Sequence, residues 1–494
     1  MLLTYVQILP SGHESAKAQA PPGPARSGLA MAPFRGVRYA AGRVSGLAEV
    51  TSPPYDVIAH DIETQLIAAD PHNVVRLILP RSATGRPGEV YADAAVALRD
   101  WLDSGILVPD QVPGLYVYEQ AATAGGAQAG RNGQAGPRPG PDHGLILQRG
   151  LIGALRLVPP EAGIVLPHED VMPGPVTGRR LLMEATQANL EPIFLLYDGS
   201  GARDSGDPAG DSGGRAHDRG APGAASRLVE AVATARKPLL EALTPDGVRH
   251  RLWALTDPAE IAAVAADLAP RQALIADGHH RYAAYRQLQA RRRSAGDGDG
   301  PWDYGLALLV DSAAYPPQIG AIHRVIPGLA PATAVELAKG AFCVRPLPGG
   351  TRDLPAALSA LGQAARGGVA FLVAGGGEAH LLSEPDPVQL AAAMPPGHSP
   401  RWQGLAASVL QELLLTRVWG VTDDEQSVRI VHHDAAMAIR AADAAPGGTA
   451  VICTPLSAAD VYAIAANGER VPRKSTSFGP KPRTGLVIRT FAQG

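Results

Sequence analysis

The hydrophobic pattern of the chain changes repeatedly between the two-residue period of strands and the helical period of about 3.6 residues. Short apolar runs predict strands at residues 35–39, 74–79, 115–120, 145–148, 151–158, 193–197, 249–255, 273–276 and 305–310. Longer amphipathic segments predict helices at residues 62–69, 90–104, 179–189, 227–243 and 258–268, the last with Thr256 or Asp257 as N-cap and Pro258 in its first turn. This mixture predicts an α/β class, more specifically an α+β core with a mixed sheet.

The pattern changes after Pro327, where we predict a second α/β unit. Its helices are expected at residues 332–339, 354–365 and 401–418, and its strands at residues 369–374 and 450–454. We therefore divide the chain into a leader at residues 1–32, a first unit at 33–327 and a second unit at 328–494. Residues 11–26 are rich in alanine, proline and glycine, which predicts disorder, and Met31 is a candidate start codon.

Three polar, glycine-rich stretches interrupt the first unit, at residues 121–141, 199–225 and 291–300. Segments of this composition bury too little apolar area to offset the entropy lost when they become ordered. We therefore expect surface insertions that carry no chemistry.

Charge and cysteine content narrow the class of protein. The 494 residues suffice for two or three domains, and 44 basic against 47 acidic side chains leave a net charge of −3. This balance argues against nucleic acid or an anionic membrane as the main partner. Only Cys343 and Cys453 are present, which is typical of a reducing compartment. No apolar run approaches the roughly eighteen residues of a spanning helix, and no signal peptide is recognisable, so we expect a cytoplasmic protein.

The strand, turn and helix start between Ala273 and Tyr285 form the first candidate site. The segment Asp277-Gly278-His279-His280-Arg281 falls at the N-terminus of the new helix, where free backbone N–H groups and the helix dipole attract anions. Gly278 lets the backbone approach a ligand closely, and Arg281 offers two donors to a phosphate. The alternative is a capped turn with surface histidines.

A second candidate is the loop Leu166-Pro167-His168-Glu169-Asp170. A carboxylate beside a histidine suits a general base, because the neighbour can orient it or shift its pKa. The alternative is a solvated acidic loop. A third candidate is Thr51-Ser52-Pro53-Pro54-Tyr55-Asp56-Val57-Ile58, in which two prolines fix the direction of Tyr55 and Asp56. That geometry suits a ligand-binding wall and a structural turn equally well.

The fourth candidate is a cationic tail at residues 469–483, with five basic residues, three hydroxyls and three prolines. Within it, Lys474-Ser475-Thr476 is similar to the end of a Walker A loop. Arg473 precedes it, however, and no strand with a glycine frame leads into it, which argues against a P-loop. An unrelated phosphate clamp and a basic surface loop remain as alternatives.

A metal site is a competing interpretation of the histidines. His279, His280 and His168 could bind zinc together with Asp277 or Glu169. Adjacent residues on a helix diverge by about 100°, and no HExxH pair supplies two ligands on one face, which argues against it. We interpret the pairs His323-Arg324 and His432-His433 as surface or packing residues.

Taken together, these motifs resemble those of a known family. The segment Ala276-Asp277-Gly278-His279-His280-Arg281-Tyr282 resembles the phosphate-binding signature of the ParB and sulfiredoxin superfamily. More broadly, the chain resembles the family of domain of unknown function 1015, from Pro33-Phe34-Arg35-Gly36 and Pro53-Pro54-Tyr55-Asp56 to Lys474-Ser475-Thr476 and Pro480-Lys481-Pro482. The resemblance implies a ParB/sulfiredoxin-like nucleotide-binding core joined to the second α/β unit.

A narrower resemblance suggests an activity. ParB-like free-serine kinases of archaea have a Pro-His-Glu loop, an Asp-Gly-His-His-Arg turn and a late Pro-Lys-Thr-Thr segment in the same order. In this chain the late segment reads Arg-Lys-Ser-Thr instead. By motif, Glu169 becomes the base, and residues 277–281 and 474–476 become the nucleotide and phosphate contacts. The implied reaction is phosphoryl transfer from ATP or ADP, with magnesium, to a small hydroxyl compound, giving O-phosphoserine when the acceptor is free L-serine.

This hypothesis gives each motif a role. The phosphates would be held by Arg281, Lys474, Ser475, Thr476 and the backbone at Gly278 and His279, and His279 or His280 would stabilise transition-state charge. Asp277 would bind magnesium or shape the turn. Glu169 beside His168 would take the acceptor proton, and Tyr55 and Asp56 would line the acceptor pocket. The alternative functions are a ParB-like regulatory switch that binds CTP or ATP, and a silent scaffold with a retained anion pocket. The kinase hypothesis requires the acidic loop, the histidine turn and the cationic tail to line one cleft.

Overall fold

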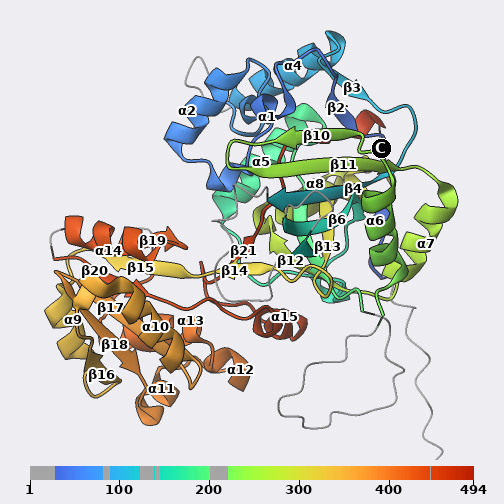
Figure 1. Ribbon diagram of the computed structural model, residues 1–494. Coiled ribbons are helices and arrows are strands. Elements are labelled where there is room, and N and C mark those ends of the chain that lie inside the picture. The colour runs from blue at the N-terminus through green and yellow to red at the C-terminus, as the bar shows by residue number, and fades with distance from the viewer. Residues whose placement is uncertain are drawn as a thin grey trace, which may run out of the picture.

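The computed structural model describes residues 28–81, 89–122, 138–139, 145–200, 221–424, 426–445 and 447–493. The chain forms a larger unit, which contains both ends of the described chain, and a smaller unit to its side (Figure 1). Among the described helices, none is both long and apolar enough to cross a lipid bilayer.

A ten-stranded mixed sheet forms the centre of the larger unit. Its main path runs in the order β10 (Leu240–Leu243), β11 (Val248–Leu255), β4 (Leu115–Ala122), β6 (Leu145–Arg156), β13 (Tyr304–Asp311), β9 (Ile193–Tyr197), β12 (Ala273–Asp277) and β7 (Val165–Leu166), while β1 (Met31–Ala32) and β5 (Arg138–Pro139) also pair with β6. The pairs β13–β9 and β12–β7 are parallel and the other neighbours are antiparallel. The predicted mixed α/β fold is thus confirmed.

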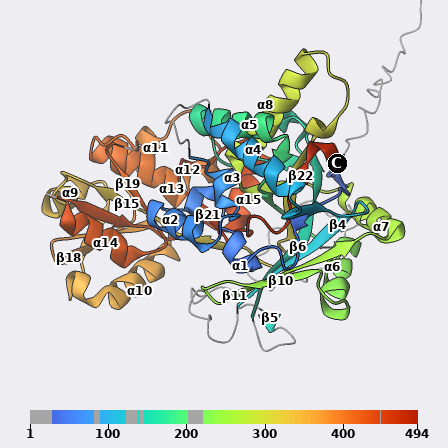
Figure 2. The same ribbon diagram turned by 90° about the horizontal axis from the view of Figure 1, so that it is seen from above.

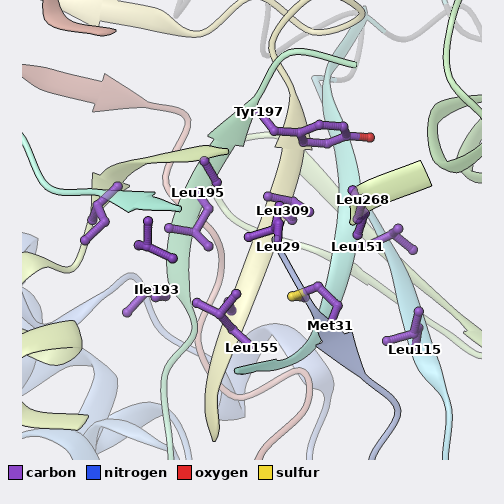
Figure 3. Packing of buried hydrophobic residues seen from close by; sticks show 14 of the residues in the cluster. Leu29, Met31, Leu115, Leu151, Leu155, Ile193, Leu195, Tyr197, Leu268 and Leu309 are labelled. Carbon is purple, nitrogen blue, oxygen red and sulfur yellow. The ribbon is translucent and has the colours of Figure 1, made fainter. Parts of the chain in front are cut away.

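Successive side chains of the central strands point to opposite faces of this sheet, and both faces are buried. Ile193, Leu195, Leu151 and Leu309 pack on one face (Figure 3). This face is covered by α5 (Pro173–Thr186), α6 (Ala224–Ala235), α7 (Pro258–Leu268) and α8 (His279–Ser294). As predicted, α7 begins with Asp257, whose side chain accepts a hydrogen bond from the Ala259 N–H, and with Pro258 in its first turn.

The opposite face of the sheet is covered by segments from late in the sequence. Two helices, α12 (Pro400–Gln403) and α15 (Ala458–Ala466), pack there with the C-terminal residues Phe478, Leu486 and Val487. The short strand β21 (Ser477–Gly479) pairs with β14 (Gln318–Gly320), and β22 (Arg489–Thr490) pairs with β8 (Ala188–Asn189). The end of the chain therefore belongs to the larger unit, and the cationic tail crosses its sheet.

A helical layer made by the N-terminal part completes the larger unit (Figure 2). It contains β2 (Val37–Tyr39), α1 (Leu47–Val50), η1 (Tyr55–Val57), α2 (His60–Ala69), α3 (Val75–Ile78), α4 (Glu89–Asp103) and β3 (Leu107–Pro109). Its core packs against Leu182 of α5 and against Ile488 near the C-terminus. The Pro53–Asp56 turn belongs to this layer of the larger unit.

The smaller unit is built on a six-stranded antiparallel sheet. Its order is β16 (Cys343–Pro346), β18 (Glu378–Ser383), β17 (Ala370–Gly375), β20 (Thr449–Ile452), β15 (Ile322–Ile326) and β19 (Arg429–His432). One face packs on α9 (Pro331–Ala338), α11 (Pro387–Ala393) and the π-helix η6 (Val409–Val418), and the other on α10 (Leu354–Ala365) and α14 (Ala435–Ala444). The second α/β unit predicted from the sequence is thus present.

The structure moves the expected boundaries of the units. Leu29 and Met31 are already buried, so the fold begins before Pro33 and the predicted leader ends earlier than residue 32. The smaller unit begins at β15, before residue 328, and the chain leaves it after β20. Most of the predicted insertions lie outside the described residues, but residues 291–294 continue α8 rather than opening a loop.

Some predicted elements have a different type or length. Residues 74–79 were expected as a strand, but residues 75–78 form α3, and just before it the Asn73 side chain accepts a hydrogen bond from the Val75 N–H. The helix expected at 227–243 ends at Ala235, and its last residues form β10. Residues 188–189 form β8 rather than the end of α5. The helix expected at 401–418 is broken after Gln403 and resumes in α13 (Ala406–Ser408) and η6.

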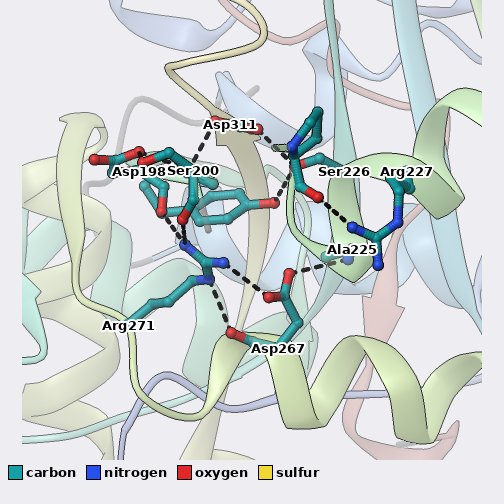
Figure 4. A network of polar contacts seen from close by, with 11 residues as sticks. Asp198, Ser200, Ala225, Ser226, Arg227, Asp267, Arg271 and Asp311 are labelled. Atoms are coloured by element: carbon teal, nitrogen blue, oxygen red, sulfur yellow. Dashed lines mark hydrogen bonds and ion pairs between the residues drawn. The ribbon is translucent and has the colours of Figure 1, made fainter. Parts of the chain in front are cut away.

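A polar network ties down the two ends of the insertion expected at residues 199–225 (Figure 4). Asp311, at the end of β13, accepts hydrogen bonds from the Gly199 N–H and from the Ser226 hydroxyl. Arg271 donates to the Ser200 carbonyl and to the Asp267 carboxylate, at 3.1 and 2.8 Å. Both ends of the insertion are thereby fixed to the sheet and to α7.

Candidate functional site

The three segments that were predicted to converge line one cleft. This cleft has a volume of about 2150 Å³ and lies between the two units. Its lining includes Glu169 from the acidic loop, His280 from the histidine turn, and Lys474 and Thr476 from the cationic tail. The smaller unit contributes residues of α10, α14, β19 and the chain after β20. The spatial requirement of the kinase hypothesis is therefore met.

The acidic loop is fastened to the cationic tail by hydrogen bonds. The Thr476 hydroxyl donates to Glu169 Oε1 at 2.8 Å, and Thr476 Oγ1 also lies 2.8 Å from His168 Nε2. A hydroxyl has one proton, so when Thr476 donates it to the carboxylate, the N–H of His168 must donate to Thr476. The Val471 N–H further donates to the His168 carbonyl at 2.8 Å. This series fixes the Glu169 carboxylate in the cleft.

Burial sets the protonation of this pair. The His168 side chain is fully buried, and burial lowers its pKa to about 3, so the ring is neutral. The Glu169 side chain is 21% exposed, and burial raises its pKa, although the Thr476 hydrogen bond and the Lys474 charge act in the opposite direction. A carboxylate with a raised pKa is a stronger base than an exposed one, and it still reaches the cleft.

The histidine turn begins α8 and supports the acidic loop. Gly278 has φ 95°, and a Cβ at this position would lie 3.0 Å from Ile193 Cγ2, so the turn favours glycine. His279 Nε2 accepts a hydrogen bond from the His168 N–H at 3.3 Å, and His280 Nε2 accepts one from the Met172 N–H at 3.1 Å. Burial lowers the pKa of both rings. The two neutral rings position the loop, which does not fit the expected role of either in meeting transition-state charge.

Arg281 is part of the interior rather than a free phosphate ligand. Its guanidinium forms an ion pair with Asp277 and donates to the Pro192 carbonyl at 2.6 Å, and its side chain is 4% exposed. Burial alone would lower its pKa, but Asp277 and Glu191 raise it above the ordinary value. The expected two-donor grip on a phosphate does not fit this arrangement, because Nη1 and Nη2 already contact Pro192 and Asp277 and the side chain is almost fully buried.

Asp277 has both carboxylate oxygens engaged. Oδ2 faces Arg281, and Oδ1 lies 2.6 Å from Lys481 Nζ. These contacts do not fit the expectation that Asp277 binds magnesium. Across the described residues, no cluster of three or more histidine, cysteine, aspartate or glutamate side chains could hold a metal ion, so the zinc interpretation gains no support.

Lys481 is a site residue that sequence reasoning did not single out. Its ammonium forms ion pairs with Asp56 and Asp277, which raise its pKa although burial alone would lower it. The Gln120 side chain donates to the Lys481 carbonyl at 2.9 Å, and the Gln148 side chain donates to the Pro480 carbonyl at 2.8 Å. The two prolines around Lys481 were the available signal, since they fix the backbone that presents this lysine.

The Pro53–Asp56 turn lines the cleft as expected. The Asp56 side chain is 35% exposed; burial alone would raise its pKa, but the charges of Lys481 and Arg281 together with hydrogen bonds lower it. The Tyr55 ring lies 4.2 Å from the guanidinium of Arg179, and the backbone N–H of Tyr55 donates to Glu191 Oε1 at 3.0 Å. The turn thus presents a partly exposed carboxylate on a fixed backbone.

The three residues Lys474, Ser475 and Thr476 do not all face the cleft. Lys474 lies in the left-handed region, with φ 53°, and lines the cleft with Thr476. The Ser475 hydroxyl instead donates to the Pro472 carbonyl at 2.5 Å, and Ser475 is buried. Its expected role in phosphate binding therefore does not fit the structure, since the hydroxyl closes a local turn.

The pair His432-His433 was interpreted as surface or packing residues, and both residues are at the surface, but they also line the cleft. Both side chains are exposed within the cleft, at the end of β19. His433 Nε2 lies 3.0 Å from the Ser477 hydroxyl of the cationic tail. No sequence motif surrounds the pair, so its position was apparent only once β19 had been placed beside β15. His323, by contrast, is buried, and its Nδ1 accepts from the Cys453 N–H at 3.2 Å.

Comparison with known proteins identifies the family. No curated protein matches the chain. A mutant of free serine kinase in complex with ADP is 14% identical, with 68% of this chain and 91% of that chain covered and a TM-score of 0.33. C-terminally truncated SbnI from Staphylococcus aureus (12% identity, 68% and 87% covered, TM-score 0.31) and a conserved hypothetical protein from Pyrococcus furiosus (12%, 69% and 95%, 0.32) are also similar. The model of the protein of unknown function DUF1015 family matches residues 31–136, 141–206 and 219–405, and the chain belongs to this family.

Proposed function

We propose that the protein transfers a phosphoryl group from ATP or ADP to the hydroxyl of a small compound, with free L-serine as the acceptor. The observation that carries this proposal is the placement of Glu169, which Thr476 holds in a cleft shared with Lys474, Lys481 and the start of α8. Phosphoryl transfer requires a protein mainly to position two reactants and to neutralise phosphate charge. A base beside a cationic region provides both.

The donor nucleotide is assigned to the cationic part of the cleft. Lys474 and Lys481 supply positive charge, and the N-terminus of α8 presents backbone N–H groups beside Gly278. Arg281 and Lys481 together balance the carboxylates of Asp277 and Asp56, which leaves the charge of Lys474 for a phosphate. Magnesium enters this proposal as part of the nucleotide complex, and no step is assigned to a metal bound by Asp277.

The acceptor hydroxyl is assigned to Glu169. When the hydroxyl oxygen bonds to the terminal phosphorus, the bond from that phosphorus to the bridging oxygen breaks, and the hydroxyl proton passes to the Glu169 carboxylate. The products are the phosphorylated acceptor and ADP, or AMP when ADP is the donor. Asp56 lies in the same cleft, where its carboxylate can bind the ammonium group of a free amino acid.

The proposal is tested by supplying ATP, ADP or CTP together with L-serine, L-threonine and L-homoserine to the purified protein. We expect O-phosphoserine by mass spectrometry, formed with ATP or ADP as donor. Binding or hydrolysis of a nucleotide without any phosphorylated acceptor would instead support the ParB-like switch, and neither binding nor product would support a silent scaffold.

Replacing Thr476 by valine should displace the acid limb of the pH–activity profile. The lost hydrogen bond stabilises the ionised carboxylate, so its removal should raise the pKa of Glu169 further, by about one unit. Because the base acts when it is deprotonated, the acid limb should move to higher pH by the same amount. The measurement is kcat as a function of pH.

The conservative variant Thr476→Ser supplies the control, since it keeps a hydroxyl and should keep the wild-type profile. An acid limb that stays in place in Thr476→Val would contradict the assignment of that limb to Glu169, even if the rate fell.

A further inference from the structure

The smaller unit lines the cleft with an exposed pair of histidines that the proposed function has not used. His432 is the last residue of β19, where its backbone pairs with Ile322 of β15. His433 follows in the left-handed region with φ 64°, and the two ring centroids are 6.0 Å apart. Non-glycine residues held in this region are strained, and such residues cluster at functional sites.

The surroundings hold His433 in one place. Its N–H donates to the Ala321 carbonyl at 2.9 Å, and its Nε2 lies 3.0 Å from the Ser477 hydroxyl. A Cβ on Gly320 would lie 1.6 Å from His433 Nδ1, so the ring packs directly on the backbone of β14. The ring is therefore pre-positioned at the border between the smaller unit and the cationic tail.

Charges from several elements face the pair. Lys474 and Lys481 on the cationic tail act on His432, together with His433 and with Asp56 from the N-terminal layer. His280 on α8 is also close to Lys474. In this group the lysines provide positive charge, and Asp56 is already paired with Lys481. A polyanion that enters here meets the two lysines and the two imidazoles in the same part of the cleft.

We infer that His432 and His433 form the second wall of the phosphate site, and that they contact the terminal phosphate of a bound nucleotide and take up a proton as it binds. This inference rests on the proposed function for the identity of the ligand as a nucleoside polyphosphate. It gives the smaller unit a role, since the phosphate site is complete only when both units contribute to it.

The electrostatics give the direction of the proton transfer. Burial, followed by the charge of Lys474, lowers the pKa of His432 to about 4, and burial and Lys481 lower the pKa of His433. Both rings are therefore neutral near pH 7. A bound polyphosphate offsets the lysines and raises both pKa values, so protons are taken up. Lysines beside a bound phosphate lower the pKa of the phosphate, so the phosphate itself would release protons rather than take them up.

The test is calorimetric titration of ADP into the full-length protein at pH 6.5, in buffers of different ionisation enthalpy. We expect proton uptake by the wild type. Uptake should be lost, and binding should weaken about tenfold or more, in the double variant His432→Gln/His433→Gln. The matched control is His380→Gln in β18, which does not line the cleft and should behave as the wild type.

Two further variants separate the histidines from other groups. Glu169 also has a raised pKa, so Glu169→Gln is titrated in parallel and should keep most of the uptake. Gly320→Ala should displace the His433 ring without removing it, and should weaken ADP binding in the same direction as His433→Gln.

The outcomes distinguish this inference from the proposed function. ADP binding with proton uptake that depends on the histidines, but without any phosphorylated product, would contradict only the kinase proposal. Product formation with unchanged ADP affinity and uptake in the double variant would contradict only this inference. If the wild-type protein did not bind ADP, the inference would be overturned.

Discussion

Replacing Glu169 by glutamine should lower the rate of phosphoryl transfer about 100- to 10,000-fold, which is the usual contribution of a general base. The amide keeps the shape of the side chain and can still contact the Thr476 hydroxyl. It cannot accept the proton of the acceptor hydroxyl at neutral pH. Nucleotide affinity should change little, because the phosphates are assigned to Lys474, Lys481 and the start of α8. The measurements are kcat for phosphoserine formation and the Kd for ADP.

The matched control for this prediction is Glu161→Gln. Glu161 is exposed, precedes the same loop in η3 (Pro160–Ala162) and does not line the cleft. It should retain the wild-type rate. If Glu169→Gln retained it as well, Glu169 could not be the base. If that variant lost ADP binding to the same extent as activity, its carboxylate would instead have a role in forming the site.

Replacing Arg281 by methionine should destabilise the larger unit by roughly 3–5 kcal/mol, the usual cost of removing one partner of a buried ion pair. Asp277 and Glu191 would both lose a neighbouring positive charge in the interior. Lys481 remains beside Asp277, so a value near the lower end is expected. The measurement is the free energy of unfolding from urea denaturation.

A second arginine on the same helix provides the comparison. Arg291 is 65% exposed and lies 3.1 Å from Glu184, and an exposed pair of this kind contributes at most about 1 kcal/mol. Arg291→Met should therefore be nearly neutral. If Arg281→Met were as stable as the wild type but failed to bind ADP, Arg281 would be a phosphate ligand, as the sequence motif first suggested.

The elements that could be predicted from the sequence were those with a strong local signal. The helix α7 was predicted because Asp257 caps it and Pro258 fixes its first turn. The central strands were predicted because their apolar runs are buried on both faces of the sheet. Residues 74–79 were wrongly predicted as a strand because a short apolar run does not distinguish a strand from a helix; the Asn73 side chain bonds to the Val75 N–H where the helical turn begins.

The domain boundary was harder to predict because it depends on contacts between distant residues. In the sequence, α15 directly follows the last predicted strand of the second unit, but Val461 and Ile464 pack on the sheet of the larger unit. Nothing local to α15 indicates which unit receives its apolar face. The cationic tail was predicted to return to the site only through the family resemblance, and the contacts of Thr476 and Lys481 agree with that return.

The site residues divide in the same way. The turn at Gly278 before a helix and the loop that carries Glu169 could be predicted, since a turn and a loop carry their signal in neighbouring residues. The partners of Arg281 and the direction of the Ser475 side chain could not be predicted, because a motif identifies the residue type but not the contacts of its side chain. His432 enters the cleft through strand pairing, which leaves no local pattern. The two prolines around Lys481 fix its backbone, but they do not indicate that the chain returns to the cleft.

The most direct test of the central claim, that three distant segments form one nucleotide site, is a crystal structure with ADP bound. We predict that the diphosphate lies between Lys474 and the start of α8, with the Glu169 carboxylate on the side of the terminal phosphate and space for a hydroxyl between them. ADP bound outside this cleft, or with its adenine rather than its phosphates beside Glu169, would contradict the account.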